Sequence, residues 1–395
     1  MPSLKIVHVI HDMDVASGGP PVVAAKLASA QAALGHQVSI ACCILPGQDE
    51  VQLRRDVQQL TESAPVSLLL LPETDGWRGF LAWGVAQSLQ QGFDGTHVVH
   101  VHGVWNHVLV LAASIAKSMG VPYVVAPHGL LDPWAMSQRS WKKRIALRLG
   151  RRRMLEESAF LHVLNSEEGQ LLKPLSLKRP YRIIPNGISV REFADLPSPG
   201  CFRSKVPSLG DAPYVLFLGR LHYKKGLDIL ASAFEKLSDR NSRVHMVVAG
   251  PDGGARTDFE RRIQAANAGS RVHLVGILKG REKLAALIDA ACFCLPSRQE
   301  GFSVAIFEAL AAGIPAVISD ACHFPEVASH GAGVVTSLDP SEIAAALSRV
   351  LEDQEGVRKM GAAGQHLVRT QYTWDQIAAN MMKEYDCFIL NRVTP

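Results

Sequence analysis

Short, uniformly apolar segments alternate with helix-forming segments along most of this chain. In the first half, the apolar segments include Lys5–Ile10, Gln37–Ile44 and Val98–His102, and sequences with helical periodicity lie between them. A strand that is apolar on both faces has to be covered on both sides, which is the situation in a parallel sheet whose connections are helices. The pattern therefore predicts an α/β fold built on a doubly wound parallel sheet.

A segment rich in proline, glycine and serine interrupts this alternation between Asp195 and Pro213. A second alternation follows, with expected strands from Tyr214–Leu218 to Gly333–Val335. A length of 395 residues also favours two domains over one. We therefore expect two Rossmann-like domains that face a cleft, because the ligands of such sheets bind at the carboxyl ends of the strands.

The most informative motif follows the expected strand Ala291–Leu295. It reads Ser-Arg-Gln-Glu-Gly-Phe-Ser-Val-Ala-Ile-Phe-Glu, and its two glutamates, Glu300 and Glu308, flank a turn that opens a helix. A strand, a short turn and a helix N-terminus together form an anion site, because free amides and the positive end of the helix dipole converge there. Carboxylates do not bind phosphate, so the glutamates are expected to bind hydroxyl groups. A phosphate carrier with sugar hydroxyls on both sides is a nucleotide sugar.

The turn after the first expected strand of the second domain supplies positive charge. Arg220 follows a glycine at the end of that strand, and Lys225 directly precedes Gly226 at the start of a helix. Arginine binds phosphate oxygens in a bidentate manner, whereas lysine acts as a movable point charge. We therefore expect a diphosphate site here, and a solvated basic turn is the alternative.

Three features mark strand ends in the first domain. Gly18 and Gly19 stand between the first strand and the first helix, in a loop that either faces a phosphate or an acceptor or is only a tight turn. His128 ends a strand at the expected cleft, where it can donate a hydrogen bond to a sugar hydroxyl or to a phosphate. His102 and Trp105 are candidates for an acceptor pocket.

Histidine spacing also raises the question of a metal. His100, His102 and His107 contain a His-x-His pattern, and alternate residues of a strand share a face. No carboxylate lies nearby in the sequence to complete such a site, so we expect no metal.

Basic residues gather in one segment. The net charge of +4 hides the fact that Arg139–Arg153 holds eight basic residues and no acidic one. If residues 141–158 form one continuous helix, a single face of it carries Arg144, Arg148, Arg151 and Arg152. The segment is then either a solvated basic helix or a surface that contacts anionic lipid or a lipid-phosphate acceptor. Nucleic acid is disfavoured because no basic surface studded with aromatic residues accompanies it.

The cysteines, the N-terminus and the lengths of the apolar runs indicate the cellular compartment. Seven cysteines form no CxxC motif, which supports neither a zinc ribbon nor a redox motif and suggests a reducing compartment. The N-terminus lacks the apolar core of a signal peptide, and no apolar run reaches the ~18 residues that span a bilayer. We therefore expect a cytoplasmic protein. Peripheral contact with the inner face of the membrane through Arg139–Arg153 is left open.

Taken in order, these motifs resemble the retaining glycosyltransferases of the GT-B fold known as family 4, or glycosyl transferases group 1. The resemblance rests first on Arg220, Lys225 and the Glu300-x7-Glu308 pair. It extends over nearly the whole chain through Gly18-Gly19, Pro127-His128-Gly129, Pro185-Asn186-Gly187, Ala309–Pro315 and Tyr372-Thr373-Trp374. Ser303 stands where many relatives carry glycine, so the sugar pocket beside it can differ.

The resemblance implies roles for the residues of the second domain. Arg220 and Lys225 hold the donor diphosphate. Glu300 contacts hydroxyls of the donor sugar, and Glu308 accepts hydrogen bonds from the ribose. The backbone amides that meet the distal phosphate belong to Phe302, Ser303 and Val304.

The resemblance also implies roles for the first domain. Gly18 and Gly19 approach the donor phosphate, and His128 faces the transferred sugar. In that fold the C-terminal helix crosses back to the first domain. We therefore expect an acceptor-side domain of residues 1–197 with 375–395, and a nucleotide-sugar-binding domain of residues 198–374.

The activity that the resemblance implies is transfer of a hexosyl group from a nucleoside diphosphate sugar to an acceptor hydroxyl, with retention at the anomeric carbon. Bacterial polysaccharide or glycolipid biosynthesis is the expected setting, with a sugar or lipid-linked acceptor and with neither a metal nor another cofactor. Three alternatives share the architecture: a nucleotide-sugar 2-epimerase, a phosphorylase that carries pyridoxal phosphate, and a non-catalytic nucleotide-sugar-binding protein.

Overall fold

The computed structural model describes residues 2–14, 19–62, 64–72, 83–132, 136, 140–240 and 242–390. Gly18 and Arg139, which the sequence singles out, lie outside these ranges. The chain forms two compact units. The first comprises the residues up to Gly187 together with those from Trp374 onward, and the second comprises Ile188–Thr373.

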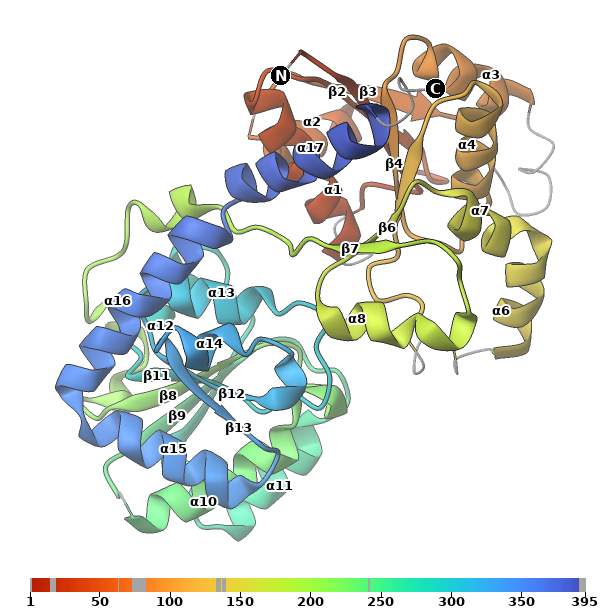
Figure 1. The fold of residues 1–395 in the computed structure, drawn as a ribbon. Coiled ribbons are helices and arrows are strands. Elements are labelled where there is room, and N and C mark those ends of the chain that lie inside the picture. The colour runs from red at the N-terminus through yellow and green to blue at the C-terminus, as the bar shows by residue number, and fades with distance from the viewer. Residues whose placement is uncertain are drawn as a thin grey trace. The chain divides into compact units, whose positions relative to one another are not determined.

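The first unit is built on a sheet of seven parallel strands (Figure 1). In spatial order the strands are β3 (Val66–Leu71), β2 (Gln37–Cys43), β1 (Lys5–Ile10), β4 (Val98–His102), β5 (Tyr123–Ala126), β6 (Leu161–Val163) and β7 (Tyr181–Ile183). The central strands β1, β4 and β5 are almost wholly buried, as expected for a sheet that is covered on both faces.

Helices cover both faces of this sheet. The described helical elements of the unit are α1 (Gly19–Ala33), α2 (Glu50–Leu60), α3 (Trp83–Phe93), α4 (His107–Ser118), α6 (Ser140–Ala146), η3 (Leu147–Arg151), α7 (Arg152–Glu157), α8 (Ser166–Leu171), η4 (Lys173–Leu175) and α17 (Trp374–Leu390). One core contains residues of α3, α4 and α7, and a second core contains residues of α1, α2 and α17. The last helix of the chain thus lies beside the first one, as the red and blue ribbons of Figure 1 show.

The second unit is built on a sheet of six parallel strands. In spatial order they are β10 (Val272–Gly276), β9 (His245–Ala249), β8 (Tyr214–Leu218), β11 (Cys292–Leu295), β12 (Ala316–Ser319) and β13 (Gly333–Thr336). The α-helices are α9 (Cys201–Lys205), α10 (Leu227–Arg240), α11 (Arg256–Ala265), α12 (Gly280–Ile288), α13 (Val304–Ala311), α14 (Glu326–Ser329), α15 (Pro340–Glu352) and α16 (Gln354–Gln371). The observed folds confirm the prediction of two doubly wound α/β domains.

The strand order in each sheet contains one reversal. In the second unit β8 lies between β9 and β11, so the chain runs outward from β8 in one direction and later returns to start again on its other side at β11. The first unit repeats this arrangement around β1 and β4. A crevice opens at such a switch point because the two connections leave the sheet toward opposite faces. The turns after β8 and β11, and those after β1 and β4, are therefore the places to look for a site.

The boundary between the two units lies earlier in the chain than the sequence suggests. We expect the boundary at residues 197 and 198, whereas the units divide between Gly187 and Ile188. Ile188 bridges to Thr373, and the side chains of Phe193 and Phe202 are buried in the core of the second unit. Proline and serine therefore occur here in a segment that is already packed against the second unit, which composition alone does not reveal.

The predicted continuous helix over residues 141–158 is wrong. Helix α6 ends at Ala146, and Leu149 and Gly150 leave helical geometry, with Gly150 at φ 96°. Arg151 consequently turns inward and is buried, and its guanidinium donates to the Trp105 carbonyl at 2.8 Å. Arg144, Arg148, Arg151 and Arg152 therefore do not lie on one helix face, because the positive φ at Gly150 changes the direction of the chain before Arg151.

Two turns approach each other closely at the switch point of the second unit. Gly226, after the short 3-10 turn η7 (Tyr223–Lys225), has φ 68°, and a Cβ atom built on it would lie 1.9 Å from the Pro296 carbonyl oxygen. Only glycine fits this position, which brings the Lys225 turn against the turn that follows β11.

We therefore expect Gly226→Ala to destabilise the protein by about 2–4 kcal/mol, because it combines left-handed strain with a backbone collision. Gly35→Ala is the matched control: its φ is 90°, but nothing lies within 4 Å of the added carbon, so the strain alone should cost about 1 kcal/mol. Thermal unfolding of both variants measures the difference. Equal losses would contradict the close approach.

Candidate active site

Arg220 provides an unpaired cation at the switch point of the second unit. It follows β8 and is exposed, and its guanidinium forms no hydrogen bond or ion pair with any residue in the described part of the chain. Its aliphatic stem packs on Gly253, where a Cβ atom would lie 2.9 Å from the Arg220 Cγ. The charge is therefore placed by packing of the stem and remains available to an anion.

Lys225 is held by the first glutamate of the Glu300-x7-Glu308 pair. Its Nζ lies 2.6 Å from Glu300 Oε1, which also accepts a hydrogen bond from the Ser297 hydroxyl. Glu300 is only 8% exposed, so water screens this pair poorly. The sequence predicted both residues at one site, and the structure brings them together through the adjacent strands β8 and β11.

The start of α13 presents open backbone donors. Its N-cap, Ser303, makes no side-chain capping bond. The amides of Phe302, Ser303 and Val304 donate to no carbonyl or side chain of the described residues. Free amides at the positive end of a helix dipole attract an anion. This is the geometry that the sequence motif predicted.

Arg298 braces the two turns. Its guanidinium forms a bidentate pair with Asp228 at 2.8 and 2.7 Å and stacks 4.0 Å from the Tyr223 ring centroid. Its backbone amide also donates to the Lys224 carbonyl at 2.7 Å. The bond to Arg298 lowers the pKa of Asp228 and keeps the carboxylate charged. Sequence reasoning missed this brace because its partner lies 70 positions away.

The second glutamate of the motif is also paired with a lysine. Glu308 lies in α13 and is buried, and its Oε1 is 2.5 Å from the Nζ of Lys283 in α12. Burial raises the pKa of Glu308, and the nearby Lys283 charge opposes that rise. Both carboxylates of the motif are thus held by cations, which sequence spacing did not predict for Glu308.

In the first unit, His128 heads a row of buried histidines. It follows β5 with φ 52°, an uncommon left-handed conformation, and its Nε2 lies 3.0 Å from His102 Nδ1. The other ring nitrogen of His102 lies 2.9 Å from His8 Nδ1. His8 Nε2 in turn lies 2.7 Å from the Oε1 of Gln31 in α1. We call these four residues the His128 row.

A second row lies beside the first on the same face of the sheet. His100 Nδ1 is 2.6 Å from the hydroxyl of Tyr385 in α17, and its Nε2 is 3.3 Å from His162 Nδ1. His162 Nε2 lies 2.7 Å from the Ile184 carbonyl oxygen. We call these four residues the His100 row. The rings of His100 and His102 stack with centroids 4.5 Å apart.

The buried histidines are neutral. Burial lowers the pKa of His8 to about 4 and that of His128 to about 3, and it lowers the pKa of His100 and His102 as well. The charged imidazolium is disfavoured because the interior solvates it poorly. At neutral pH each ring therefore has one N–H group and one bare nitrogen.

The histidine cluster does not have the form of a metal centre. One nitrogen from each of His8, His100 and His102 lies within 4.8 Å of the others, but both ring nitrogens of each already have hydrogen-bond partners in the protein. His107, which the sequence suggested with them, instead lies near Arg151. The absence of a metal stays a prediction.

Of the two residues expected to line an acceptor pocket, His102 is buried and Trp105 is partly exposed. His102 is only 2% exposed and both its nitrogens are used, so we assign it no acceptor contact. Trp105 is half-buried, its indole Nε1 lacks a partner among the described residues, and Lys143 lies 5.1 Å above its ring. Gly19 is exposed at the start of α1, and Gly18 lies outside the described residues.

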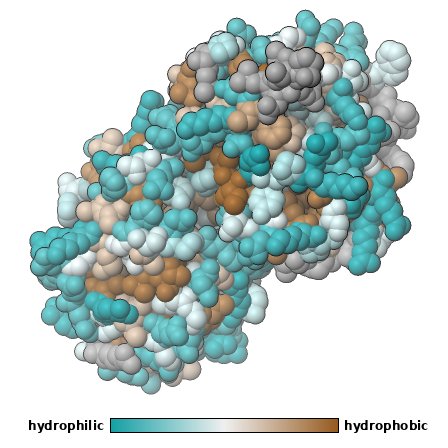
Figure 2. All heavy atoms as spheres, viewed as in Figure 1, coloured by the Kyte–Doolittle hydropathy of each residue, from teal (hydrophilic) through white to brown (hydrophobic). Residues whose placement is uncertain are grey.

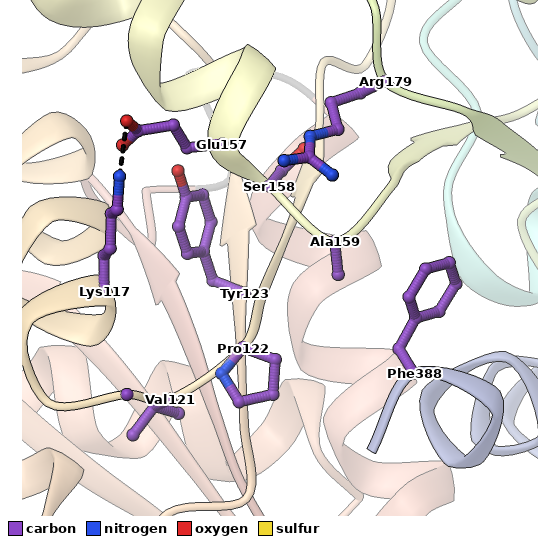
Figure 3. Close-up of a pocket in the computed structure, with 10 residues that line it drawn as sticks. Lys117, Val121, Pro122, Tyr123, Glu157, Ser158, Ala159, Arg179 and Phe388 are labelled. Carbon is purple, nitrogen blue, oxygen red and sulfur yellow. Dashed lines mark ion pairs between the residues drawn. The ribbon is translucent and has the colours of Figure 1, made fainter. Parts of the chain in front are cut away.

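A surface pocket of about 340 Å³ lies elsewhere in the first unit (Figure 3). Its lining includes Pro122, directly before β5, and Ala159, two residues before β6, so it lies at the amino ends of the strands, opposite the edge that carries His128. An ion pair between Lys117 and Glu157 borders it. None of the predicted site residues lines this pocket.

Comparison with known proteins fits this geometry. The model of the glycosyl transferases group 1 matches residues 202–367, and that of a glycosyl transferase 4-like domain matches residues 18–187. The GDP-mannose:cellobiosyl-diphosphopolyprenol alpha-mannosyltransferase of Xanthomonas oryzae is 25% identical over 97% of this chain and 96% of its own. The phosphatidyl-myo-inositol mannosyltransferase of Mycolicibacterium smegmatis is 32% identical over 51% of each chain.

Solved structures share the fold. HepE from Anabaena, crystallised with UDP and glucose, is 17% identical and superposes with a TM-score of 0.73 over 97% of this chain and 100% of its own. A glycosyltransferase from Rickettsia africae is 15% identical, with a TM-score of 0.75 over 99% and 100%. The two family models together match most of both units, and the chain therefore belongs to the group 1 glycosyltransferases of the GT-B fold.

Proposed function

We propose that this glycosyltransferase moves a hexosyl group from a nucleoside diphosphate sugar to the hydroxyl of a lipid-linked acceptor, with retention at the anomeric carbon. The observation that supports this best is the cation and amide arrangement in the second unit. The unpaired Arg220 guanidinium, the Lys225 ammonium and the open amides of α13 belong to turns that follow two adjacent strands. They form a site for a diphosphate.

Such a site serves the chemistry as well as the binding. When the bond between the sugar and the diphosphate breaks, negative charge develops on the leaving oxygen. Fixed cations and amide dipoles stabilise that charge without having to reorganise, which is often the largest contribution to catalysis. Arg220 contributes a bidentate donor and Lys225 a point charge, so we assign the leaving-group stabilisation to these two residues.

The glutamates are better suited to positioning than to covalent chemistry. Glu300 is bound to Lys225 and Ser297, and Glu308 is bound to Lys283. A carboxylate that is neutralised by a neighbouring lysine is a weak nucleophile, and its free oxygen still accepts hydrogen bonds from hydroxyl groups. We therefore propose that Glu300 orients Lys225 and meets the donor sugar, and that Glu308 meets the ribose.

GDP-mannose is the donor that we propose first, because the Xanthomonas relative, which aligns along nearly its whole length, is named for this donor. In a thermal-shift series, we expect GDP-mannose to raise the melting temperature more than UDP-glucose, since a ligand that binds the folded state stabilises it. Incubation with a polyprenol-linked acceptor and proton NMR of the new anomeric linkage then test transfer and retention. Failure of every nucleotide sugar to shift the melting temperature would contradict the proposal.

Arg220→Ala tests the leaving-group assignment. We expect kcat to fall by roughly 10²–10³, because one preorganised charge that acts on the developing anion is lost. The melting temperature should change little, since Arg220 is exposed and has no described partner. Arg261→Ala is the matched control, because Arg261 is an exposed arginine on α11. Full transfer activity of Arg220→Ala would contradict the assignment.

An exposed surface of basic and apolar side chains on the first unit supports a lipid-linked acceptor. Trp141 and Ile145, one helical turn apart on α6, and Leu149, at the break that follows, are 63, 47 and 56% exposed. Exposed Lys142, Arg144 and Arg148 lie among them. We call these six residues the basic–apolar patch.

The patch has the composition of a surface that inserts apolar side chains at an anionic membrane while basic ones meet the headgroups. Figure 2 shows that hydrophilic residues cover most of the face it displays, with smaller apolar areas among them. No helix of the described residues combines the length and the apolar character needed to cross a bilayer.

We expect Trp141→Glu to weaken binding to vesicles that contain an anionic phospholipid by about tenfold or more, because it removes a large apolar contact and adds repulsion. Trp83→Glu is the control, since Trp83 is also exposed but lies on α3. Vesicle sedimentation measures binding. Equal binding of the two variants would contradict the assignment of the patch.

A further inference from the structure

We propose that Gln31, His8 and His102 are positioning residues that hold His128 as the neutral tautomer protonated on Nε2, with Nδ1 left bare to accept a hydrogen bond. The inference rests on the proposed function only for the identity of the partner, a donor hydroxyl. It follows from the direction in which hydrogen bonds run along the His128 row. The sequence motif around His128 does not predict the tautomer.

The direction begins at Gln31. Its Oε1 faces His8 Nε2 at 2.7 Å, and an amide oxygen only accepts, so His8 carries its proton on Nε2. The Nδ1 of neutral His8 is then bare, and His102 Nε2, 2.9 Å away, must donate to it. The Nδ1 of His102 is bare in turn. His128 Nε2, 3.0 Å away, must therefore donate, which leaves His128 Nδ1 without a proton.

The burial of the row makes this order strict. Gln31, His8 and His102 are at most 2% exposed, so water does not offer an alternative partner. An unpaired donor or acceptor in such a place costs about 1–3 kcal/mol. Each ring can satisfy both neighbours in only two ways, all forward or all reversed. The Gln31 amide selects the forward order because its Oε1, and not its Nε2, faces His8.

The His100 row takes its order from a different acceptor. The Ile184 carbonyl oxygen accepts from His162 Nε2, so His162 Nδ1 is bare and accepts from His100 Nε2. His100 Nδ1 then accepts from the Tyr385 hydroxyl. This row ends at Tyr385, whose hydroxyl also meets the Gln31 side chain, and it contains no hydrogen bond to His128. His100 itself is hydrogen-bonded to Tyr385 and His162 and not to a member of the His128 row, so it provides a control of equal size and burial, two positions from His102 on the same strand.

The consequence concerns what His128 recognises. The sequence allowed His128 to donate to a sugar hydroxyl or to a phosphate. A bare Nδ1 accepts from a hydroxyl, whereas a phosphate oxygen has no proton to offer it. The left-handed backbone at His128 and the row behind its ring fix where that lone pair points. His128 thus selects a hydroxyl-bearing group over an anion, and the selection is set at Gln31, two rings away.

Nitrogen-15 NMR of histidine tautomers tests the proposal on the intact protein without any substrate. In protein labelled with nitrogen-15 histidine, long-range proton–nitrogen correlations distinguish the two tautomers of each ring. Signals are assigned with single histidine variants. We expect His8, His102 and His128 to be protonated on Nε2 at pH 7, together with His100 and His162. Protonation of His128 on Nδ1 would overturn the proposal.

Gln31→Met tests the origin of the order, because methionine keeps the length of the side chain and removes the acceptor. We expect Nδ1–H forms to appear at His8, His102 and His128, while His100 and His162 keep their Nε2–H forms. The kcat/KM for the donor should fall about threefold to tenfold, the factor that corresponds to one net hydrogen bond. Unchanged tautomers in this variant would overturn the role of Gln31.

His100→Phe is the matched control. It should lower the melting temperature, since it disrupts the His100 row, but it should leave the His128 tautomer and the kcat/KM for the donor unchanged. If it shifts the His128 tautomer as Gln31→Met does, the effect is general loss of packing and the proposal is overturned. The tautomers are measured without a donor, so failure of the proposed function leaves the NMR result standing, and a wrong tautomer leaves the proposed function standing.

Discussion

The parallel pairing of β8 with β11 is the contact on which the site of the second unit depends. The two strands are adjacent in the sheet but lie some distance apart in the chain, so their carboxyl ends bring together two turns that local structure cannot connect. Gly226 lets these turns touch, and Arg298 fixes them to each other through Asp228 and the Lys224 carbonyl. The charges that an anion would meet are therefore positioned by backbone pairing and close packing, with little freedom left to the side chains.

Charge balance within the site has a second consequence. Lys225 and Lys283 each face a glutamate, whereas Arg220 has no such partner in the described part of the chain. Without a ligand, the glutamates thus balance most of the positive charge of the site. This lowers the electrostatic cost of holding several cations near one another. Arrival of a diphosphate then has to compete with Glu300 for Lys225, and that competition couples the position of the glutamate to the presence of the donor.

Much of the fold is readable from the sequence, because apolar runs and helical periodicity locate the strands and the parallel arrangement gathers their ends at one edge. The same logic predicted that Arg220, Lys225 and Glu300 lie together. The remainder depends on contacts between distant positions. Nothing in the chain near Arg298 indicates Asp228, and a lone glycine such as Gly150 is tolerated in many helices, so the break after α6 was not predicted. His8 and His162 did leave a signal: each is a polar residue between apolar neighbours inside a strand, and such a residue needs a buried partner.

Helix α17 makes the interior of the first unit depend on the last part of the chain. Its residues Ile377, Met381 and Tyr385 complete a core whose other members are encoded before Gly187. At ribosomal rates of about 5–20 residues per second, the intervening unit takes roughly 10 to 40 s to emerge. During that time the core that α1 and α2 share with α17 lacks its last helix. The second unit can finish folding first, although it is synthesised later, and the first unit closes only after α17 has been made.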